Sequence, residues 1–295
     1  MYCSLCPRQC KALRTETAAE GRCAMPALPV VARAALHFWE EPPISGKRGS
    51  GTVFFSGCPL GCVFCQNEVI SHENFGKTIT VDQLRAIFSN LKGQGSHNIN
   101  LVNPTHFAHA IRQALEVPPG IPVVWNTGGY ERVETLQAMA GKVDIYLPDL
   151  KYTRTETAAR CSDAPDYPEV AKAAIVEMVN QVGKCTFDEE GMLRRGVIIR
   201  HLILPGRLAE AKEVMDWVAE TFQPGTVLFS LMSQYTPWGK AKEMPGLNRR
   251  LRGSEIRAAQ DYMDQLGLDG FTQGEEAARS DYIPNFDLTG VDALK

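Results

Sequence analysis

The amino-acid sequence predicts an α/β fold: a partial (βα)6 TIM-like barrel that follows a short N-terminal Cys-rich metal-binding segment. From Gly51 onward, short apolar runs alternate with stretches of 3.6-residue periodicity, the pattern of βα units around a parallel sheet. Six such units can be counted, fewer than the eight of a closed barrel, so we expect a barrel that is open along one side. The expected divisions are residues 1–35 for the metal-binding segment, 36–273 for the barrel and 274–295 for a C-terminal tail.

Composition limits the class of protein. The chain has 295 residues, 44% of them apolar, which suffices for a large core. Its net charge is −3 and no long run of one sign occurs, so nucleic acid is not expected as a partner. A basic leader and a stretch of about 18 apolar residues are both missing from the sequence, which predicts a cytoplasmic protein with no membrane association. In that compartment nine cysteines indicate metal ligands or buried thiols rather than disulfides.

The first cysteine group predicts a metal site in the N-terminal segment. Its members are Cys3, Cys6, Cys10 and Cys23. The segment is too short and too polar to form its own core, so a metal would have to supply folding energy. Four thiolates complete a tetrahedral site, which makes structural zinc the first interpretation. A second iron–sulfur cluster is the alternative, because it accepts the same ligands.

The remaining elements are expected in the following order. Residues 30–50 are expected to link the segment to the barrel, with His37, Glu40 and Glu41 forming a polar edge on an early strand rather than a site. Strands are predicted at 52–55, 98–102, 122–125, 143–147, 197–204 and 226–232. Helices are predicted after N-caps at Thr80, Thr105 and Ser254, and also near 133–139, 166–182 and 208–222. Residues 185–194 are predicted to form a small hairpin outside the barrel.

A second cysteine group follows the first predicted barrel strand. It has the spacing Cys58-x3-Cys62-x2-Cys65, in a turn rich in Gly and Pro. A structural zinc site usually takes two separated pairs of ligands, whereas this loop offers three thiolates and no local fourth. Three thiolates can ligate three corners of a four-iron cluster and leave one iron open for a substrate or cofactor. A zinc knuckle and a disulfide pair are the alternatives.

With Phe64 before its last cysteine, this loop resembles that of the radical S-adenosylmethionine (SAM) superfamily. The resemblance implies a [4Fe-4S] cluster on Cys58, Cys62 and Cys65, whose open iron holds the amino and carboxylate groups of SAM. One-electron reduction then cleaves SAM to methionine and a 5'-deoxyadenosyl radical.

Polar residues also follow the other predicted strands, at the ends that converge on the mouth of a barrel. They are Asn103, Asn126, Asp149 with Lys151, Arg200 with His201, and Gln234 with Tyr235. The runs Asn126-Thr127-Gly128, Asp149-Leu150-Lys151, Ile199-Arg200-His201 and Leu204-Pro205-Gly206 are similar to those of the enzymes that activate glycyl radical enzymes, such as pyruvate formate-lyase activating enzyme. Leu231-Met232-Ser233-Gln234-Tyr235 is similar to a run in a branch related to them.

That similarity implies cofactor contacts from Phe64, Asn126, Asp149, Lys151, Arg200 and Gln234. Phe64 would lie beside the adenine, and Lys151 or Arg200 would pair with the cofactor carboxylate. Two positions depart from the pattern. Asn103-Pro104-Thr105 stands where relatives have Gly-Gly-Glu, which leaves the clamp for the amino group unassigned, and Asn126 stands where activating enzymes have an acidic residue. Cys161 and Cys185 match no motif and are expected to be buried or idle thiols.

The implied activity is abstraction of hydrogen from a glycine of a partner glycyl radical enzyme, with electrons from a donor such as flavodoxin or ferredoxin. One alternative is radical modification of another peptide, a nucleoside or a small metabolite. The other is a non-catalytic metal-binding protein. Sequence alone leaves the substrate open.

Overall fold

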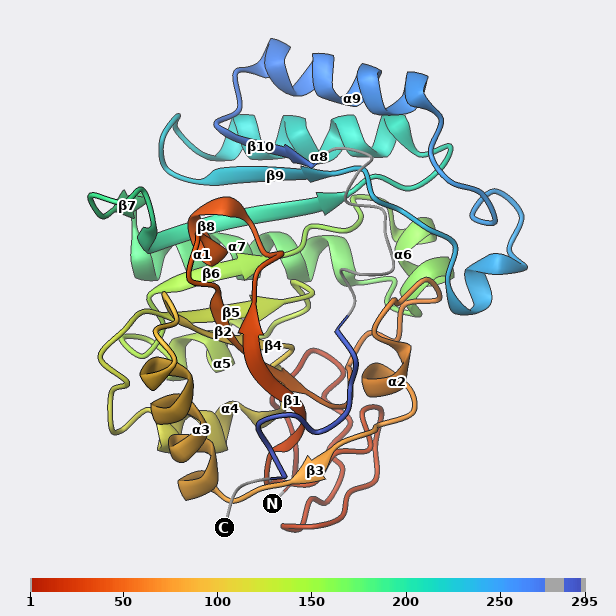
Figure 1. Ribbon diagram of the computed structural model, residues 1–295. Coiled ribbons are helices and arrows are strands. Elements are labelled where there is room, and N and C mark those ends of the chain that lie inside the picture. The colour runs from red at the N-terminus through yellow and green to blue at the C-terminus, as the bar shows by residue number, and fades with distance from the viewer. Residues whose placement is uncertain (1, 274–283, 293–295) are drawn as a thin grey trace.

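The computed structural model describes residues 2–273 and 284–292, so most of the expected C-terminal tail lies outside the described residues (Figure 1). One mixed sheet organises the chain, in the order β10-β9-β8-β6-β5-β4-β2-β1-β3. Its parallel strands are β2 (Ser50–Phe55), β4 (Ile99–Val102), β5 (Val123–Thr127), β6 (Ile145–Pro148), β8 (Leu193–Leu202), β9 (Leu228–Met232) and β10 (Gly270–Gln273). In the described part of the chain, the end strands do not pair to close a ring. The fold is therefore a partial barrel, as predicted.

The sheet has one parallel strand more than the sequence predicts. β10 is short and lacks an apolar run, so its pairing with β9, rather than its composition, makes it a strand. Gly270 makes this pairing possible, because a Cβ atom there would lie 1.8 Å from the carbonyl oxygen of Phe229.

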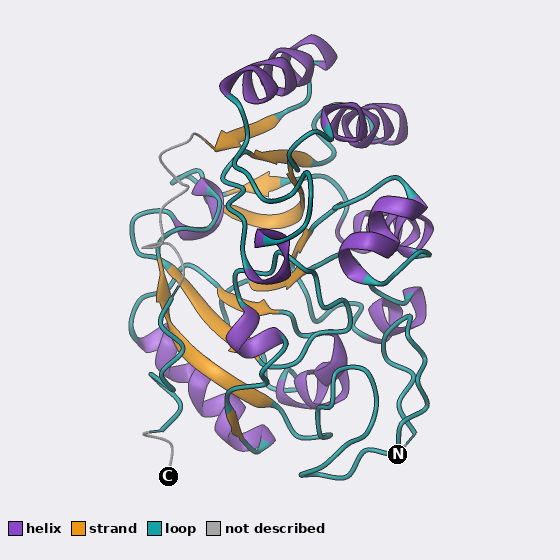
Figure 2. Ribbon diagram, turned by 90° about the vertical axis from the view of Figure 1, so that its right-hand side faces the viewer, coloured by secondary structure: helices purple, strands orange, loops and turns teal. Residues whose placement is uncertain are grey.

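The helices mostly follow their strands and lie along the outside of the curved sheet (Figures 1 and 2), except that the first packs through Ile44 with Val124, Ile145 and Leu147 in a separate buried cluster. They are α1 (Pro42–Ser45), α2 (Glu68–Ser71), α3 (Val81–Gly93), α4 (Ala108–Ala114), α5 (Val133–Ala138), α6 (Thr155–Ser162), α7 (Tyr167–Val182), α8 (Leu208–Thr221) and α9 (Gly253–Leu266), with 3-10 turns η1 (Thr105–Phe107) and η2 (Gly239–Lys242). No helix in the described ranges combines the length and the apolar character needed to cross a bilayer.

One of the three predicted N-caps is confirmed. Thr80 accepts a hydrogen bond from the N–H of Gln83, whose side chain reaches back to complete a capping box. Thr105 instead begins η1 and donates its hydroxyl to the buried Glu131. The last helix begins two residues earlier than predicted: its N-cap is Arg252 instead of Ser254, and the N–H of Arg252 donates to the Glu255 carboxylate.

Residues 30–37, which were expected to be part of a link, form strand β1 (Val30–His37). It pairs antiparallel with β2 and with the two-residue strand β3 (Lys77–Thr78). The boundary expected at residue 35 falls inside this strand. The described C-terminal residues run along its other edge, where Leu288 N–H donates to Ala32 O at 3.0 Å and Ala34 N–H donates to Thr289 O at 2.8 Å. The predicted hairpin is confirmed, with β7 (Thr186–Phe187) antiparallel to β8.

Candidate active site

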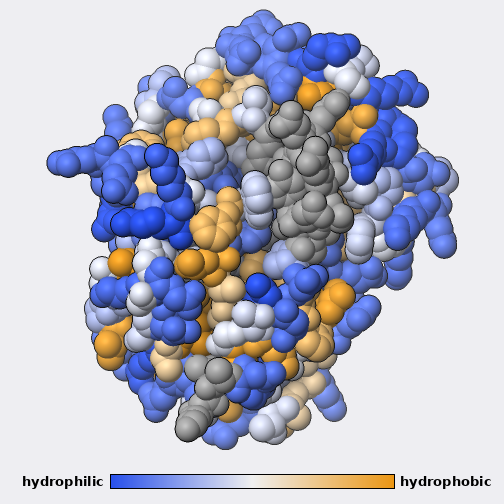
Figure 3. Space-filling model, in the orientation of Figure 1, coloured by the Kyte–Doolittle hydropathy of each residue, from blue (hydrophilic) through white to orange (hydrophobic). Residues whose placement is uncertain are grey.

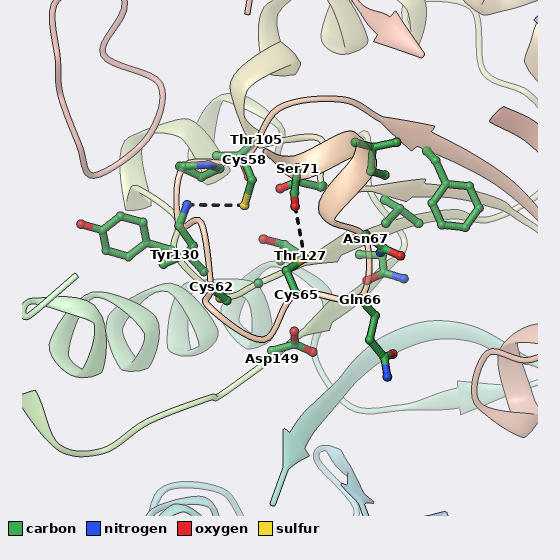
Figure 4. Close-up of a pocket in the computed structure, with 18 of the residues that line it drawn as sticks. Cys58, Cys62, Cys65, Gln66, Asn67, Ser71, Thr105, Thr127, Tyr130 and Asp149 are labelled. Atoms are coloured by element: carbon green, nitrogen blue, oxygen red, sulfur yellow. Dashed lines mark hydrogen bonds between the residues drawn. The ribbon is translucent and has the colours of Figure 1, made fainter. Parts of the chain in front are cut away.

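The three cysteines after β2 lie in a cavity at the C-terminal ends of the parallel strands. The cavity measures about 280 Å³, close to the lower end of the range for small-molecule sites. Its lining includes Cys58, Cys62, Cys65, Asn103, Asn126, Asp149, Lys151 and Arg200. Figure 4 shows the cysteine loop with Thr105, Thr127 and Asp149 around it. The structure therefore brings together residues from β2, β4, β5, β6 and β8, as the pattern of strand ends predicts.

We call residues 56–67 the cluster loop. Its backbone is held by two polar side chains, those of His106 and Asn103. His106, which is 1% exposed, forms a 2.7 Å hydrogen bond through Nε2 with the carbonyl of Ser56. Burial lowers the pKa of His106 to about 4, so the neutral imidazole donates this bond. Asn103 donates its amide to the carbonyl of Gly57. Asn103, predicted to lie in the pocket, thus also anchors the loop.

Each cluster thiol receives a hydrogen-bond donor. Ser162 Oγ lies 3.0 Å from Cys62 Sγ, Ser71 Oγ 3.2 Å from Cys65 Sγ, and the N–H of Leu60 3.4 Å from Cys58 Sγ (Figure 4 shows the last two). Such donors stabilise a thiolate.

Burial nevertheless raises the pKa of the Cys65 thiol to about 12, with the neighbouring cysteines adding to the rise. Within residues 2–273 and 284–292, no three Cys, His, Asp or Glu side chains already stand in a metal-binding arrangement. The chemistry of the donor set does fit an iron–sulfur cluster, because three thiols share one loop and point to one cavity with donors on their sulfurs. Iron binding would displace the thiol protons.

Ser162→Ala is expected to make the reduction potential of the bound cluster more negative, because a hydroxyl donor to Cys62 favours the more negatively charged reduced state. Ser162 is 1% exposed and its oxygen lies 2.8 Å from the hydroxyl of Tyr152, so its orientation is fixed. Potentiometric titration followed by electron paramagnetic resonance measures the change. Ser162→Thr, which keeps a hydroxyl, serves as the control, and equal potentials in the alanine variant and the wild type would refute the role.

An ionic network lies beside the thiols. Arg200 Nε lies 2.9 Å from Asp149 Oδ1, and its Nη2 donates to Asn126 Oδ1 at 2.7 Å. Lys151 pairs with the second Asp149 oxygen. Burial by itself would raise the pKa of Asp149, but the charges of Arg200 and Lys151 outweigh it and hold the pKa below its usual value. The network therefore carries two fixed cations next to the cluster loop, both able to bind a carboxylate.

Glu40 also belongs to this network, and the prediction of a polar strand edge is wrong for it. Its Oε2 lies 3.5 Å from Arg200 Nη1, and its Oε1 accepts the amide of Asn126 at 3.2 Å. Burial raises the pKa of Glu40, against the opposing charge of Arg200. The neighbouring Glu41 is 1% exposed, so it is no surface edge either. Glu40 thus brings from the end of β1 the negative charge that Asn126 lacks at the end of β5.

Two predicted cofactor contacts lie elsewhere. Among the described residues, those that line the cavity include neither Phe64 nor Gln234. Phe64 is buried with its ring 5.9 Å from that of Tyr235, in an edge-to-face contact. Their contact with a cofactor stays a prediction. Cys161 is buried and Cys185 is partly buried, as expected.

One buried carboxylate, bonded to residues that line the cavity, was not predicted from the sequence. Glu131 is 1% exposed and accepts hydrogen bonds through Oε1 from Thr105, Thr127 and Trp125. Its Oε2 has no hydrogen-bond partner among the described residues. Burial raises the pKa of Glu131 to about 7, although these hydrogen bonds oppose the rise.

This pKa predicts a pH-dependent stability. Because the folded state holds the Glu131 proton more tightly than the unfolded chain, the protein is stabilised below the unfolded pKa, and this stability is lost as the pH rises to about 7. Relative to Glu131→Gln, the free energy of unfolding of the wild type should fall by an amount on the order of 3 kcal/mol across this range. Urea titrations of both proteins at several pH values measure it. Parallel pH curves would contradict the assignment.

Comparison with known proteins agrees with this geometry. The model of the Radical SAM superfamily matches residues 52–218. The chain is 34% identical over 245 residues to the uncharacterized protein MJ0674 of Methanocaldococcus jannaschii, covering 79% of this chain and 67% of that protein.

Three solved structures show partial similarity. A radical SAM methyltransferase from Sphaerobacter thermophilus has a TM-score of 0.47 at 15% identity, covering 76% of this chain and 67% of that one. A domain of pyruvate-formate lyase-activating enzyme from Bacteroides vulgatus has a TM-score of 0.38 at 14% identity, covering 66% and 91%. A spore photoproduct lyase mutant with bound AdoMet and dinucleoside spore photoproduct has a TM-score of 0.49 at 12% identity, covering 74% of both chains. These scores are too low to compare functions.

Proposed function

Because the chain belongs to the radical SAM superfamily, we propose that it activates a partner glycyl radical enzyme by abstracting hydrogen from a glycine of that partner. Membership of the superfamily implies a [4Fe-4S] cluster and SAM, which together supply a 5'-deoxyadenosyl radical when bound. Cys58, Cys62 and Cys65 would hold the cluster. Lys151 and Arg200 are the cations available to a carboxylate in the cavity, and Glu40 is the carboxylate available to an ammonium group.

The observation that supports a protein partner is a pair of exposed aromatic side chains beside the cavity. Phe38 and Trp39 are 49% and 58% exposed, and they lie between His37 and Glu40, which both line the cavity. The loop that holds them crosses the middle of the face in Figure 1, and Figure 3 shows hydrophobic residues gathered there between hydrophilic areas. Exposed aromatic residues are enriched at protein interfaces. A polypeptide docked on this loop would present a residue at the mouth of the cavity.

The barrel mouth supports the same proposal. The sheet is not closed between its end strands in the described part of the chain. An electron donor such as flavodoxin or ferredoxin is also part of the proposal, because SAM cleavage consumes an electron that this chain does not supply. A polar cavity containing Glu40 and Arg200 favours one second candidate, radical modification of a nucleoside, another peptide or a small metabolite.

The test uses the anaerobically reconstituted protein with SAM, a chemical reductant and candidate glycyl radical enzymes. We expect 5'-deoxyadenosine and an electron paramagnetic resonance signal of a glycyl radical. If the partner protein is the substrate, the double variant with Phe38→Ser and Trp39→Ser should reduce both. Cleavage of SAM without any glycyl signal, but stimulated by a small-molecule fraction, would favour the second candidate. No cleavage under strong reductant would indicate a non-catalytic metal-binding protein.

A further inference from the structure

The N-terminal cysteines gather in a segment that has little structure of its own. We call Cys3, Cys6, Cys10 and Cys23 the N-terminal thiols. The described residues before β1 contain no helix, only the isolated bridges of Tyr2 with Leu13 and Arg14 with Ala19. The backbone folds back on itself, since Cys3 N–H donates to Ala12 O at 2.9 Å and Lys11 N–H donates to Cys3 O at 3.1 Å. Cys3 and Cys6 are 7% and 6% exposed, and Cys3 packs with Leu5 and Met25 in the main core cluster.

Backbone turns hold the N-terminal thiols within one folded segment. Gln9 N–H donates to Cys6 O at 3.0 Å, and Ala24 N–H, next to Cys23, donates to Gly21 O at 3.1 Å. A Cβ atom on Gly21 would lie 2.9 Å from Cys10 Sγ, so this sulfur is packed against the turn before Cys23. The segment thus carries four soft ligands that are separate from the cavity, because none of the N-terminal thiols is among the residues that line it.

Backbone N–H groups point at these sulfurs in the same way as in the cluster loop. Burial raises the pKa of the Cys6 and Cys23 thiols, and the backbone N–H groups of Arg8 and Met25 oppose the rise, each from two residues further along the chain. Leu60 and Asn67 stand in the same relation to Cys58 and Cys65. Peptide donors on a sulfur stabilise the thiolate that binds a metal. This arrangement, found twice in one chain, is the second sign of a ligand site.

Two arginines next to these thiols hold the cluster loop. Arg8 donates from Nε to Pro59 O at 2.8 Å and from Nη2 to Ser162 O at 3.0 Å. Arg22 donates to Leu60 O at 3.1 Å and forms a 2.8 Å ion pair with Asp163. The N-terminal segment therefore connects the cluster loop to the end of α6, where Ser162 donates to Cys62.

We propose that the N-terminal thiols bind a zinc ion, and that this ion holds Arg8 and Arg22 on the backbone of the cluster loop. Four thiolates complete the tetrahedral shell of zinc and leave no open position for a substrate. Cys10 is exposed, which suits a metal without redox chemistry better than an iron–sulfur cluster. The ion would supply the folding energy that the segment lacks. This site does not depend on which substrate the enzyme uses.

The metal assignment is tested by measuring zinc and iron in the full-length protein purified anaerobically. We expect about one zinc ion per chain, lost in Cys10→Ser and kept in Cys185→Ser, a control outside both cysteine groups. Absence of zinc from the wild type would overturn the assignment. So would additional iron that disappears in Cys10→Ser, because it would indicate a second cluster.

Hydrogen exchange tests whether Arg8 and Arg22 hold the cluster loop, a pair of contacts that we call the clamp. Removing zinc with a chelator is expected to speed amide exchange in residues 57–65. The double variant Arg8→Gln with Arg22→Gln should keep its zinc and show the same loss of protection, which separates the clamp from loss of the metal. Arg85→Gln is the matched control, because Arg85 also donates to backbone carbonyls, at Gln113 and Ala114, but far from the loop in sequence. Unchanged exchange in residues 57–65 after zinc removal would refute the clamp.

Discussion

Cys62→Ala is expected to abolish both cluster assembly and the production of 5'-deoxyadenosine. Cys62 is one of only three thiols in the cluster loop, so its loss leaves two ligands for a cluster that needs three from the protein. The measurements are iron and sulfide per chain after anaerobic reconstitution, and product formation with SAM and reductant. Activity should fall to the level of the assay background.

Cys161→Ala provides the matched control for this loss. Cys161 is a thiol of the same size, 2% exposed, and its backbone carbonyl accepts the N–H of Val63 in the cluster loop, a contact that alanine keeps. The control should retain iron and activity. If Cys62→Ala held as much iron as this control, Cys62 would not be a cluster ligand.

Arg200→Met is expected to destabilise the protein and to weaken SAM binding. Asp149 and Glu40 carry side chains only 13% and 11% exposed, and both would lose their pairing with Arg200. Removing one partner from a buried ion pair costs roughly 3–5 kcal/mol. Urea unfolding measures the change in the free energy of unfolding, and equilibrium dialysis with SAM measures the binding.

Arg154→Met is the comparison for stability. Its pair with Glu213 is exposed, at 42% and 41%, so its loss should change the free energy of unfolding much less. Equal losses in the two variants would contradict the view that burial gives Arg200 its effect. The contact between Arg200 and Glu40 is tested separately by Glu40→Gln. This variant should leave the pair of Arg200 with Asp149 in place and lose less free energy of unfolding than Arg200→Met.

Strand ends could be predicted from the sequence because buried parallel strands are apolar and their ends are polar. This rule predicts four polar residues beside the cysteines, and all four line the cavity with them: Asn126, Asp149, Lys151 and Arg200. The element pattern fails where tertiary pairing decides the structure. Residues 30–37 and 270–273 become strands only because neighbouring strands offer them hydrogen bonds.

Residues that reach the site from outside the barrel could not be predicted. Glu40 follows an antiparallel strand, so the rule about parallel strand ends does not include it. Ser71 and Ser162 come from helices, and a serine in a helix carries no sign in sequence that its hydroxyl will meet a sulfur. Their positions depend on how α2 and α6 pack beside the cluster loop.

The place of Glu40 has a consequence for how such a site can diversify. Its carboxylate stands at the end of β1, while the side chain it complements, Asn126, stands at the end of β5. An alignment of barrel strands would record a lost acid at residue 126 and miss the one supplied from β1. Lengthening or shortening the turn after β1 would change the charge of the cavity while every barrel strand stayed the same. Two proteins descended from one barrel could therefore select different ligands through a segment outside the barrel.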